Sequence, residues 1–283
     1  MLRELIAVGD VMLDGVLPAP VPGRRIHGRI ELRAGGSAAN AALAAVRLGA
    51  RAAVVGRVGA DAAGRLVVDD LAAAGVEVLL ARDEDAPTGS VVVLGGSSIV
   101  ADPGASALLA PEDVPVPLTA GAVLVSGYSL LQSGSEPAAR AAVERAQTAW
   151  LAVDAASANL ISAFGIERFY AATAQVDVLL ANAEEAFALT GLEGEAAALE
   201  LGRHCRVACV KLGGEGAVAA TAGVTARATV QPVEGGASTL GAGDSFAAGF
   251  LLALGSGAGL AVALQAGCDT ATASIVERAT SRA

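Results

Sequence analysis

Short apolar runs alternate along this chain with longer segments that are rich in alanine. The apolar runs are typical of strands buried on both faces of a sheet, and we expect such strands at Leu5–Val8, Ala52–Val55, Val123–Ser126, Leu151–Asp154, Val178–Ala181 and Val207–Lys211. The alanine-rich segments have high helix propensity and predict helices at Ser37–Leu48, Gly64–Ala74, Pro137–Thr148, Ala183–Thr190, Gly243–Leu254 and Leu260–Val276. This alternation favours an α/β fold whose central sheet is mostly parallel.

Two early segments interrupt the alternation and have no crossover helix. Val16–Arg33 contains prolines and glycines and ends in a run, Arg29–Arg33, that favours a strand. Thr88–Ala101 reads as a strand, a Gly95-Gly96 turn and a second strand, which is typical of a hairpin. We expect these segments, at about 16–33 and 88–101, to form a small antiparallel lid beside the main sheet. The alternative is that the two segments are surface loops without a functional motion. Because no long linker is evident, residues 1–283 are expected to form a single domain.

Composition narrows the classes of protein to consider. Of the 283 residues, 54% are hydrophobic and only 3% are aromatic, so alanine, valine and leucine must fill the core. The net charge of −10 disfavours nucleic acids and anionic membrane surfaces as partners. Glycines interrupt the uncharged stretch Phe246–Cys268, which predicts two buried helices rather than a membrane span. The three cysteines show neither a zinc spacing nor a disulfide framework, and no signal peptide is evident, so we expect a cytoplasmic protein.

Several common types of active site find little support in the sequence. His27 and His204 are the only histidines, which leaves little for histidine-rich metal sites or Ser-His-Asp catalysis. The chain contains neither a P-loop nor a G-x-G-x-x-G dinucleotide fingerprint. A Rossmann-type oxidoreductase is therefore disfavoured.

The most informative motif is Gly241-Ala242-Gly243-Asp244, which precedes a predicted helix. Small residues let successive backbone N–H groups converge on one point, and the helix dipole behind them favours an anion such as phosphate. A carboxylate at such a point needs a chemical reason. Proton removal from a hydroxyl that then attacks a phosphoryl group provides one. The alternative is an ordinary helix N-terminus with an aspartate in its first turn.

Polar residues and glycines also lie between the first predicted strand and the first predicted helix. Asp10 and Asp14 follow the strand, where ligands bind in open α/β sheets, and carboxylates suit the vicinal hydroxyls of a sugar. Gly35 and Gly36 permit a close backbone approach before the helix, and Asn40 offers a polyol both a donor and an acceptor. The alternatives are solvated loop acids and a glycine turn with an N-cap serine.

A third motif, Asn182-Ala183-Glu184-Glu185, stands at the start of a predicted helix. The amide of Asn182 and the carboxylate of Glu185 can share one side, and together they suit a hydrated Mg²⁺ held through water. The same spacing fits a capping box, in which Asn182 caps the helix and Glu185 reaches back to it. Both interpretations stay open.

A fourth motif begins at Lys211, the only lysine of the chain, and continues with Gly213, Gly214 and Gly216. It stands between two predicted strands. A glycine turn with one compact cation suits the phosphate or ribose of a nucleotide. An ordinary glycine-rich β-turn is the alternative.

Taken in order, these motifs resemble those of the ribokinase-like (PfkB-type) carbohydrate kinases, over nearly the whole chain. The resemblance implies a three-layer αβα sandwich with a small β lid over the acceptor site, and in many relatives such lids pair into a homodimer. It also implies ATP and Mg²⁺, with transfer of the γ-phosphoryl group to a primary hydroxyl of a small sugar. That sugar would be ribose-, fructose- or ketodeoxy-sugar-like.

The resemblance assigns roles to single residues. Asp244 matches the catalytic base, and the backbone N–H groups of Gly241, Ala242 and Gly243 match the anion hole for the transferring phosphoryl group. The expected acceptor ligands are Asp10, Asp14, Gly35, Gly36 and Asn40, the expected nucleotide-side residues are Asn182, Lys211, Gly213, Gly214 and Gly216, and Asn182 with Glu185 matches the motif that organises Mg²⁺ through water.

Some positions depart from the family pattern. Ser238 stands where relatives usually carry the aspartate of a monovalent-cation loop, and Val276–Ala279 lacks the usual glycine, so potassium activation is disfavoured. Arg24, Arg25 and Arg29 could bind a phosphorylated sugar, although solvated arginines are the simpler interpretation.

Two alternatives to a plain sugar kinase stay open. A nucleoside kinase of the same fold is the nearer one, and the lack of Phe, Tyr and Trp in the lid segments favours a plain sugar over it. The other is a non-catalytic regulator that binds a sugar or a nucleotide. The intact Asp244, Asn182 and Glu185 argue against the regulator, because a binding module has no need for a base.

Overall fold

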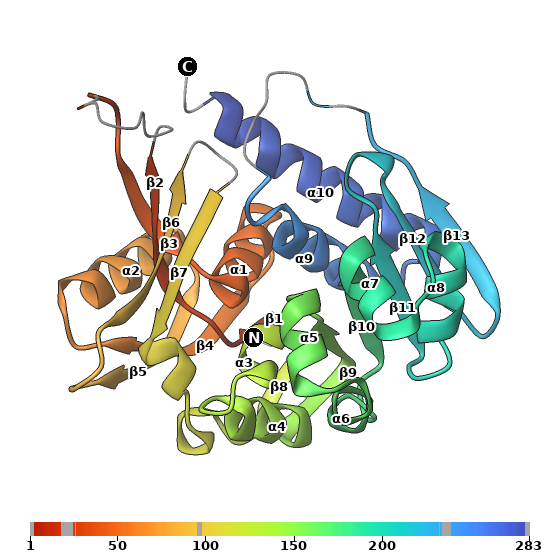
Figure 1. Cartoon of the computed structure of the whole chain (residues 1–283), viewed down its shortest axis with the longest axis horizontal. Coiled ribbons are helices and arrows are strands. Elements are labelled where there is room, and N and C mark those ends of the chain that lie inside the picture. Colours follow the sequence, from red (N-terminus) through yellow and green to blue (C-terminus); the bar gives the residue numbers. More distant parts are fainter. Residues whose placement is uncertain are drawn as a thin grey trace.

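The computed structural model describes residues 3–17, 25, 27–94, 98–231, 233 and 239–280. In this part of the chain, nine strands form one large sheet in the order β13-β12-β11-β10-β9-β8-β1-β4-β5 (Figure 1). They are β1 (Arg3–Val8), β4 (Ala52–Gly59), β5 (Glu77–Asp83), β8 (Leu118–Ser126), β9 (Ala146–Asp154), β10 (Val178–Asn182), β11 (Val207–Lys211), β12 (Ala217–Thr221) and β13 (Val224–Ala228). The pairs β11–β12 and β12–β13 are antiparallel and the other pairs are parallel, which confirms the predicted sheet.

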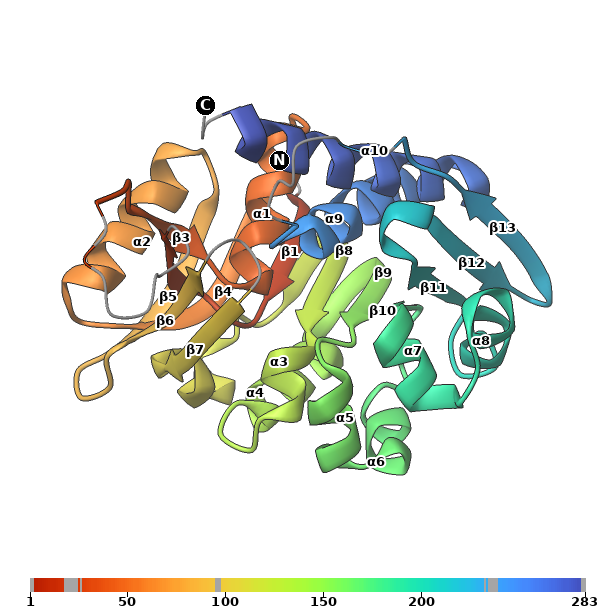
Figure 2. The ribbon, with the colours of Figure 1, turned by 45° about the horizontal axis from the view of Figure 1, so that its top comes forward.

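Helices cover both faces of this sheet, as the αβα prediction requires (Figure 2). One face carries α1 (Ser37–Arg47), α2 (Ala62–Ala73), α9 (Ala242–Gly255) and α10 (Leu260–Thr280). The other face carries α3 (Gly127–Leu131), α4 (Glu136–Arg145), α5 (Ala158–Phe164), α6 (Ile166–Ala172), α7 (Ala183–Thr190) and α8 (Gly194–Leu201). The three-layer sandwich is therefore confirmed.

Strand β1 shows why the sheet needs both layers. Leu5 and Ala7 point into the apolar cluster under α1 and α9, whereas Ile6 and Val8 point into the cluster on the opposite face. All four side chains are buried. A strand buried on both sides must be apolar at every position, so it appears in the sequence as an unbroken apolar run.

A smaller sheet lies to one side of the large one (Figure 2). Its strands, in the order β3-β2-β6-β7, are β2 (Met12–Leu17), β3 (Glu31–Gly35), β6 (Thr88–Leu94) and β7 (Ser98–Gly104). β2 pairs antiparallel with β3 and parallel with β6, and β6 pairs antiparallel with β7. The sheet draws on both segments expected to form the lid, but it begins earlier, at Met12, and ends later, at Gly104. The expected Gly95-Gly96 turn lies outside the described residues, and the action of this sheet as a lid stays a prediction.

For one helix the prediction from the sequence extends too far, to Thr148. α4 ends at Arg145, and Ala146 begins strand β9. Ala146 pairs with Leu118 of β8, and Gln147 pairs with the next residue of that strand. The hydrogen bonds of the sheet here override the helix propensity of alanine and glutamine, which is a weak local preference.

The two apolar helices predicted in the uncharged stretch are present as α9 and α10, and they pack against each other. Within the described ranges, no helix has the length and apolar character needed to cross a membrane. α9 is buried on most sides, and its Phe246 and Phe250 rings stack with their centroids 5.8 Å apart.

Phenylalanines on two helices test this packing. Phe250 of α9 is fully buried, whereas Phe187 of α7 is 53% exposed. Phe250→Ala should lower the free energy of unfolding by about 3–5 kcal/mol because it leaves a cavity against the sheet. Phe187→Ala should change it by less than about 0.5 kcal/mol. Urea unfolding followed by circular dichroism measures both, and equal losses in the two variants would contradict this assignment of the core.

Candidate active site

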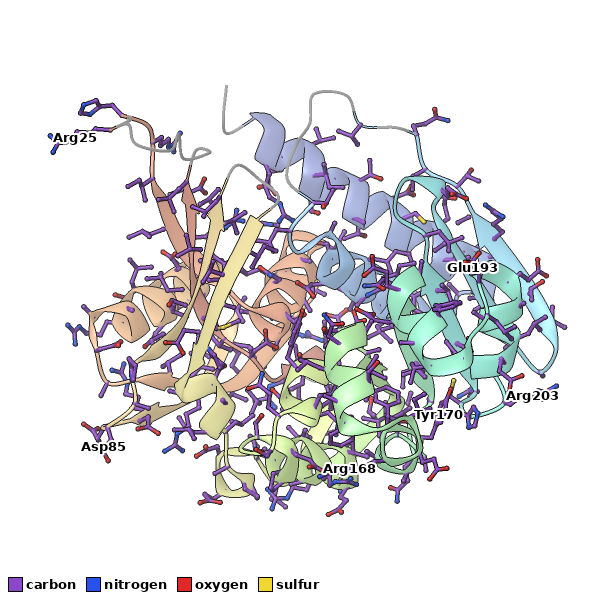
Figure 3. All side chains as sticks on the ribbon, in the orientation of Figure 1. Arg25, Asp85, Arg168, Tyr170, Glu193 and Arg203 are labelled. Atoms are coloured by element: carbon purple, nitrogen blue, oxygen red, sulfur yellow. The ribbon has the colours of Figure 1, made fainter. Side chains whose placement is uncertain are left out.

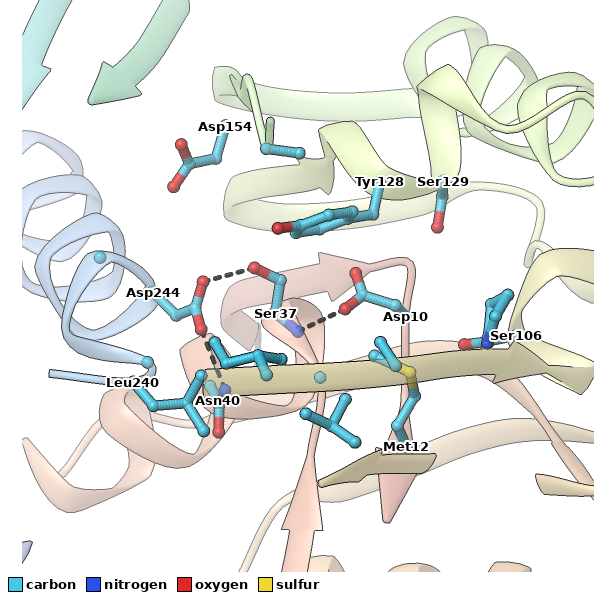
Figure 4. Close-up of a pocket in the computed structure, with 18 of the residues that line it drawn as sticks. Asp10, Met12, Ser37, Asn40, Ser106, Tyr128, Ser129, Asp154, Leu240 and Asp244 are labelled. Carbon is cyan, nitrogen blue, oxygen red and sulfur yellow. Dashed lines mark hydrogen bonds between the residues drawn. The ribbon is translucent and has the colours of Figure 1, made fainter. Parts of the chain in front are cut away.

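A cavity of about 830 Å³ lies between the large sheet and the smaller sheet (Figure 4). The large sheet contributes residues at or just beyond the carboxyl ends of parallel strands, namely Asp10, Tyr128, Asp154, Asn182 and Lys211. This is the edge at which open α/β sheets bind ligands. The first turns of α1 and α9 and one face of the smaller sheet complete the cavity.

Asp244 lies in the first turn of α9 and is held by two side chains of α1. Its carboxylate accepts hydrogen bonds from the Ser37 hydroxyl and, at 3.0 Å, from Nδ2 of Asn40 (Figure 4). The carboxylate faces the cavity, and loss of water around it raises its pKa to about 6. The two hydrogen bonds oppose this shift because they favour the ionised form. Asp244 is therefore ionised at neutral pH but has a higher proton affinity than an ordinary aspartate.

The turn before this aspartate forms the N-terminus of a long helix. Gly241 has a φ of 72° and stands just before α9, which begins at Ala242 and has 14 residues. A Cβ on Gly241 would lie 3.2 Å from Nη1 of Arg278, and a Cβ on Gly243 would lie 3.3 Å from Nζ of Lys211. Two cationic side chains thus approach the positive end of the helix dipole. Together these charges favour an anion at the turn.

Asp10 lines the cavity, but its carboxylate already has protein partners. One oxygen accepts a hydrogen bond from the backbone N–H of Ser37, and the other accepts one from the Ser126 hydroxyl, both at 2.6 Å. Burial raises its pKa. Gly36, the residue before Ser37, has a φ of 90°, and a Cβ on it would lie 2.4 Å from the backbone oxygen of Asp10. Glycine at this position thus lets Asp10 fix the start of α1.

Asp14 lies on β2 and is only 2% exposed, yet it lines the cavity. A Cβ on Gly35 would lie 2.0 Å from its Cγ, so the neighbouring strand must carry glycine where the carboxylate rests. Burial raises the pKa of Asp14 to about 6, which the charge of Arg33 partly opposes. Asp14 is therefore a partly desolvated carboxylate with capacity to accept hydrogen bonds from a ligand.

Asn182 and Glu185 form the capping box that their spacing allowed. Oδ1 of Asn182 accepts from the Glu185 N–H at 2.9 Å, and Glu185 accepts from the Asn182 N–H at 2.8 Å and from its Nδ2 at 2.6 Å. Both side chains also line the cavity. Burial and the nearby charge of Asp154 raise the pKa of Glu185 to about 7. Their oxygen atoms suit Mg²⁺ held through water, and that role stays a prediction. No group of three or more potential His, Cys, Asp or Glu ligands is present among the described residues.

Lys211 reaches the cavity, but as half of an ion pair. Its Nζ lies 2.6 and 2.7 Å from the two carboxylate oxygens of Asp154. Asp154 was not identified from the sequence, although it ends a predicted strand just as Lys211 does. The positive charge of Lys211, which we expected to face a nucleotide, is therefore largely balanced by Asp154.

The glycines that follow Lys211 form a 3-10 turn, Gly213–Glu215, between β11 and β12. Gly213, Gly214 and Gly216 are not among the residues that line the cavity. A Cβ on Gly216 would lie 2.1 Å from the backbone oxygen of Ala228, whereas one on Gly214 would meet nothing within 4 Å. Packing against β13 thus explains Gly216, and the nucleotide contact of this turn stays a prediction.

Two further cavity residues had no signal in the sequence beyond their place after a predicted strand. Tyr128 lies across the cavity from Ser37, and burial raises its pKa to about 12 (Figure 4). Ser129 is buried, and its hydroxyl is the one fully buried side-chain N or O atom without a hydrogen-bond partner in the described ranges. Both residues come from α3.

Arg25 and Arg29 of the early segment are not among the described residues that line this cavity. Arg25 and Arg29 are exposed, and Figure 3 shows Arg25 at the periphery of the molecule. Arg24 and Ser238 lie outside the described residues, so the phosphate contact of Arg24 and the loss of potassium activation at Ser238 stay predictions. Arg278 is partly buried, which lowers its pKa to about 10.

Comparison with known proteins identifies the class to which this fold and site belong. The pattern of the family described as pfkB family carbohydrate kinase matches residues 2–283. The chain therefore belongs to the pfkB family and is a carbohydrate kinase.

Individual relatives agree with this assignment. The chain is 29% identical over 303 residues to the 5-dehydro-2-deoxygluconokinase of Geobacillus thermodenitrificans, covering 96% of this chain and 87% of that protein. A shorter match, 48% identical over 93 residues, joins 30% of this chain to 19% of the bifunctional protein HldE of Ectopseudomonas mendocina. The crystal structure of adenosine kinase from Sinorhizobium meliloti superposes with a TM-score of 0.87 at 26% identity, covering 98% of this chain and 94% of that one.

The ion pair behind the glycine turn can be tested by its effect on stability. Lys211→Met should lower the free energy of unfolding by about 3 kcal/mol, because it leaves the Asp154 carboxylate largely buried and unpaired. Arg203→Met removes an exposed pair with Glu200 and should cost less than about 0.5 kcal/mol. In an Asp154→Asn background, Lys211→Met should cost less than in the wild type. Equal costs in the two backgrounds would mean that the pair is not coupled.

Proposed function

We propose that this protein transfers the γ-phosphoryl group of ATP to a primary hydroxyl of a small sugar, with Asp244 as general base. The observation that carries the proposal is the position of the Asp244 carboxylate. It faces the cavity beside a helix N-terminus suited to phosphate, and two α1 side chains fix its orientation. Family membership supports both the kinase chemistry and ATP as the donor.

The phosphate groups of ATP would lie at the Gly241–Gly243 turn. The backbone N–H groups of Gly241 and Gly243 would stabilise the charge that develops on the transferring phosphoryl group, whereas the Ala242 N–H donates to the Thr239 carbonyl at 3.0 Å. Asn182 and Glu185 carry oxygen atoms that suit a hydrated Mg²⁺, which when bound would neutralise charge on the phosphates. Lys211 would add positive potential behind the turn while its pairing with Asp154 fixes its place.

The sugar would lie on the opposite side of Asp244, towards Asp14. The Asp14 carboxylate and the backbone at Gly36 would hold its hydroxyls and direct one of them at Asp244. Asp244 would accept the proton of that hydroxyl while the hydroxyl oxygen attacks the γ-phosphorus and the bond from this phosphorus to the β,γ-bridging oxygen breaks, which releases ADP. Asp10 would act on the start of α1, because both of its oxygens are bound to the protein.

Substitution of the base tests the mechanism. Asp244→Asn should lower kcat by about 10²–10⁴-fold, because an amide cannot accept the proton, while the affinities for ATP and sugar change little. Asp269→Asn alters an exposed aspartate on α10 and should leave kcat unchanged. Release of ADP across a panel of sugars and nucleosides measures the rates. Near-normal turnover of the Asp244 variant would refute the base assignment, and ATP binding without any turnover would favour a binding regulator.

The raised pKa of Asp244 predicts how activity depends on pH. The carboxylate must be ionised to accept a proton, and its pKa is about 6. Above pH 6 the ionised form dominates, so the titration of Asp244 adds no further pH dependence to kcat/KM there. Below it, kcat/KM should fall about tenfold for each pH unit. An acid limb that persists unchanged in the residual rate of Asp244→Asn would assign it to another group.

A further inference from the structure

The cavity has two unlike walls, and the smaller sheet supplies the apolar one. Side chains alternate between the faces of a strand, and the pairs Val91–Ala101 and Val93–Ile99 stand in register on β6 and β7. All four residues line the cavity, together with Met12 of β2. Apart from the Asp14 carboxylate on β2, this face is therefore aliphatic.

The aliphatic surface extends to the point of phosphoryl transfer. Met12 and Leu240 pack against the buried cluster formed by Val16, Val91 and Val93. Leu240 directly precedes the Gly241 turn and itself lines the cavity. Part of any acceptor that reaches Asp244 must consequently contact apolar side chains.

The facing wall is polar. Tyr128 and Ser129 lie across the cavity from Met12 in Figure 4. The Ser129 hydroxyl has no hydrogen-bond partner among the described residues, although it is fully buried. A buried hydroxyl without a partner costs free energy, which a ligand hydroxyl can recover by bonding to it.

The charges that line the cavity are predominantly negative. The described lining contains five carboxyl groups, those of Asp10, Asp14, Asp154, Glu185 and Asp244, and a single ammonium group, that of Lys211. The guanidinium groups of Arg33 and Arg278 act on the Asp14 carboxylate from outside this lining. That ammonium group is already paired with Asp154. At the sugar side, an acceptor carboxylate would meet Asp14, and like charges brought together in a desolvated site are strongly unfavourable.

Building on the proposed function, we infer that the acceptor is an uncharged glycoside, with a polyol part that meets Asp14 and Ser129 and an apolar substituent that packs under the smaller sheet. The lack of aromatic residues in the lid segments favoured a plain sugar. The aliphatic face of the smaller sheet changes that expectation, because it gives an apolar substituent the surface that a stacking ring would otherwise supply. Sugar acids, including carboxylated ketodeoxy sugars, fall outside the inferred class.

Three acceptors that differ in one feature each separate the parts of this inference. D-Ribose is neutral and has no substituent, adenosine adds a planar apolar group, and D-ribonate carries a carboxylate on an open chain, for which neutral open-chain ribitol is the control. Calorimetric binding and ADP release should both rank them in the order adenosine, ribose, ribonate, with steps of about tenfold or more. Ribonate bound as tightly as ribose, ribose bound as tightly as adenosine, or no binding of any of the three would overturn the inference.

Two neighbouring residues on β7 provide a matched pair of variants. Ile99 and Val100 are 55% and 64% exposed, but only Ile99 lines the cavity. Ile99→Asn should lower the affinity for adenosine, and with it the preference for adenosine over ribose, about tenfold. Val100→Asn should leave both unchanged. Because both side chains are exposed, neither variant is expected to unfold, and an unaltered preference in Ile99→Asn would contradict the apolar subsite.

Asp14→Asn tests the electrostatic part. It should raise the affinity for ribonate relative to ribose about tenfold, since the opposing charge is removed while the side chain keeps its size. An unchanged ratio would contradict the charge argument. Binding in the predicted order without ADP release would refute the phosphoryl transfer and leave the acceptor class supported. ADP release with ribonate as the preferred acceptor would support the phosphoryl transfer and refute the inferred acceptor class.

Discussion

The hydrogen bonds from α1 to Asp244 are the constraint around which the site is built. They join residues 207 and 204 positions apart in the sequence, and they require that α1 and α9 start at the same edge of the sheet. The two helices are in contact, and buried alanines such as Ala41 of α1 and Ala248 of α9 belong to the same apolar cluster. Asp10 adds to this constraint, because it binds the backbone at the start of α1 and ties that helix to β1.

The helix N-termini that meet at the cavity also explain how the protein tolerates so many carboxylates in one site. Three helices, α1, α7 and α9, begin at the cavity edge, and the positive ends of their dipoles offset part of the negative charge. The ion pair of Lys211 and Asp154 balances one further carboxylate. Burial nonetheless raises the pKa of Asp244 to about 6 and that of Glu185 to about 7. The site thus holds ionised carboxylates close to the pH at which they would take up protons, which suits a base that must accept one.

The smaller sheet contributes a different property to the site. Its inner face is aliphatic, while β2 places the Asp14 carboxylate within that same face, over Gly35. A single carboxylate at the edge of an apolar surface orients a polyol more strictly than a uniformly polar surface would, because few alternative partners are present. Under the proposed function, the large sheet and its helices would hold the phosphoryl group, and the smaller sheet would hold the acceptor.

The sequence by itself indicated the longer apolar and alanine-rich elements and the local motifs of the site, but not β5, β13 or the short helices α3, α5, α6 and α8. Strand β11 was predicted with its observed bounds because a strand buried on both faces forms a short apolar run. Helix α7 was also predicted with its observed bounds, from its alanine-rich segment. Gly36, Asn40 and Asp244 were identified because glycine turns and carboxylates at helix starts are local patterns. Only the tertiary structure decided which partners these groups have. The pairing of Lys211 with Asp154, the strand start at Ala146, and the apolar face shared by Val93 and Ile99 all depend on which strands become neighbours, and that is fixed by packing across the whole chain rather than by any local run of residues.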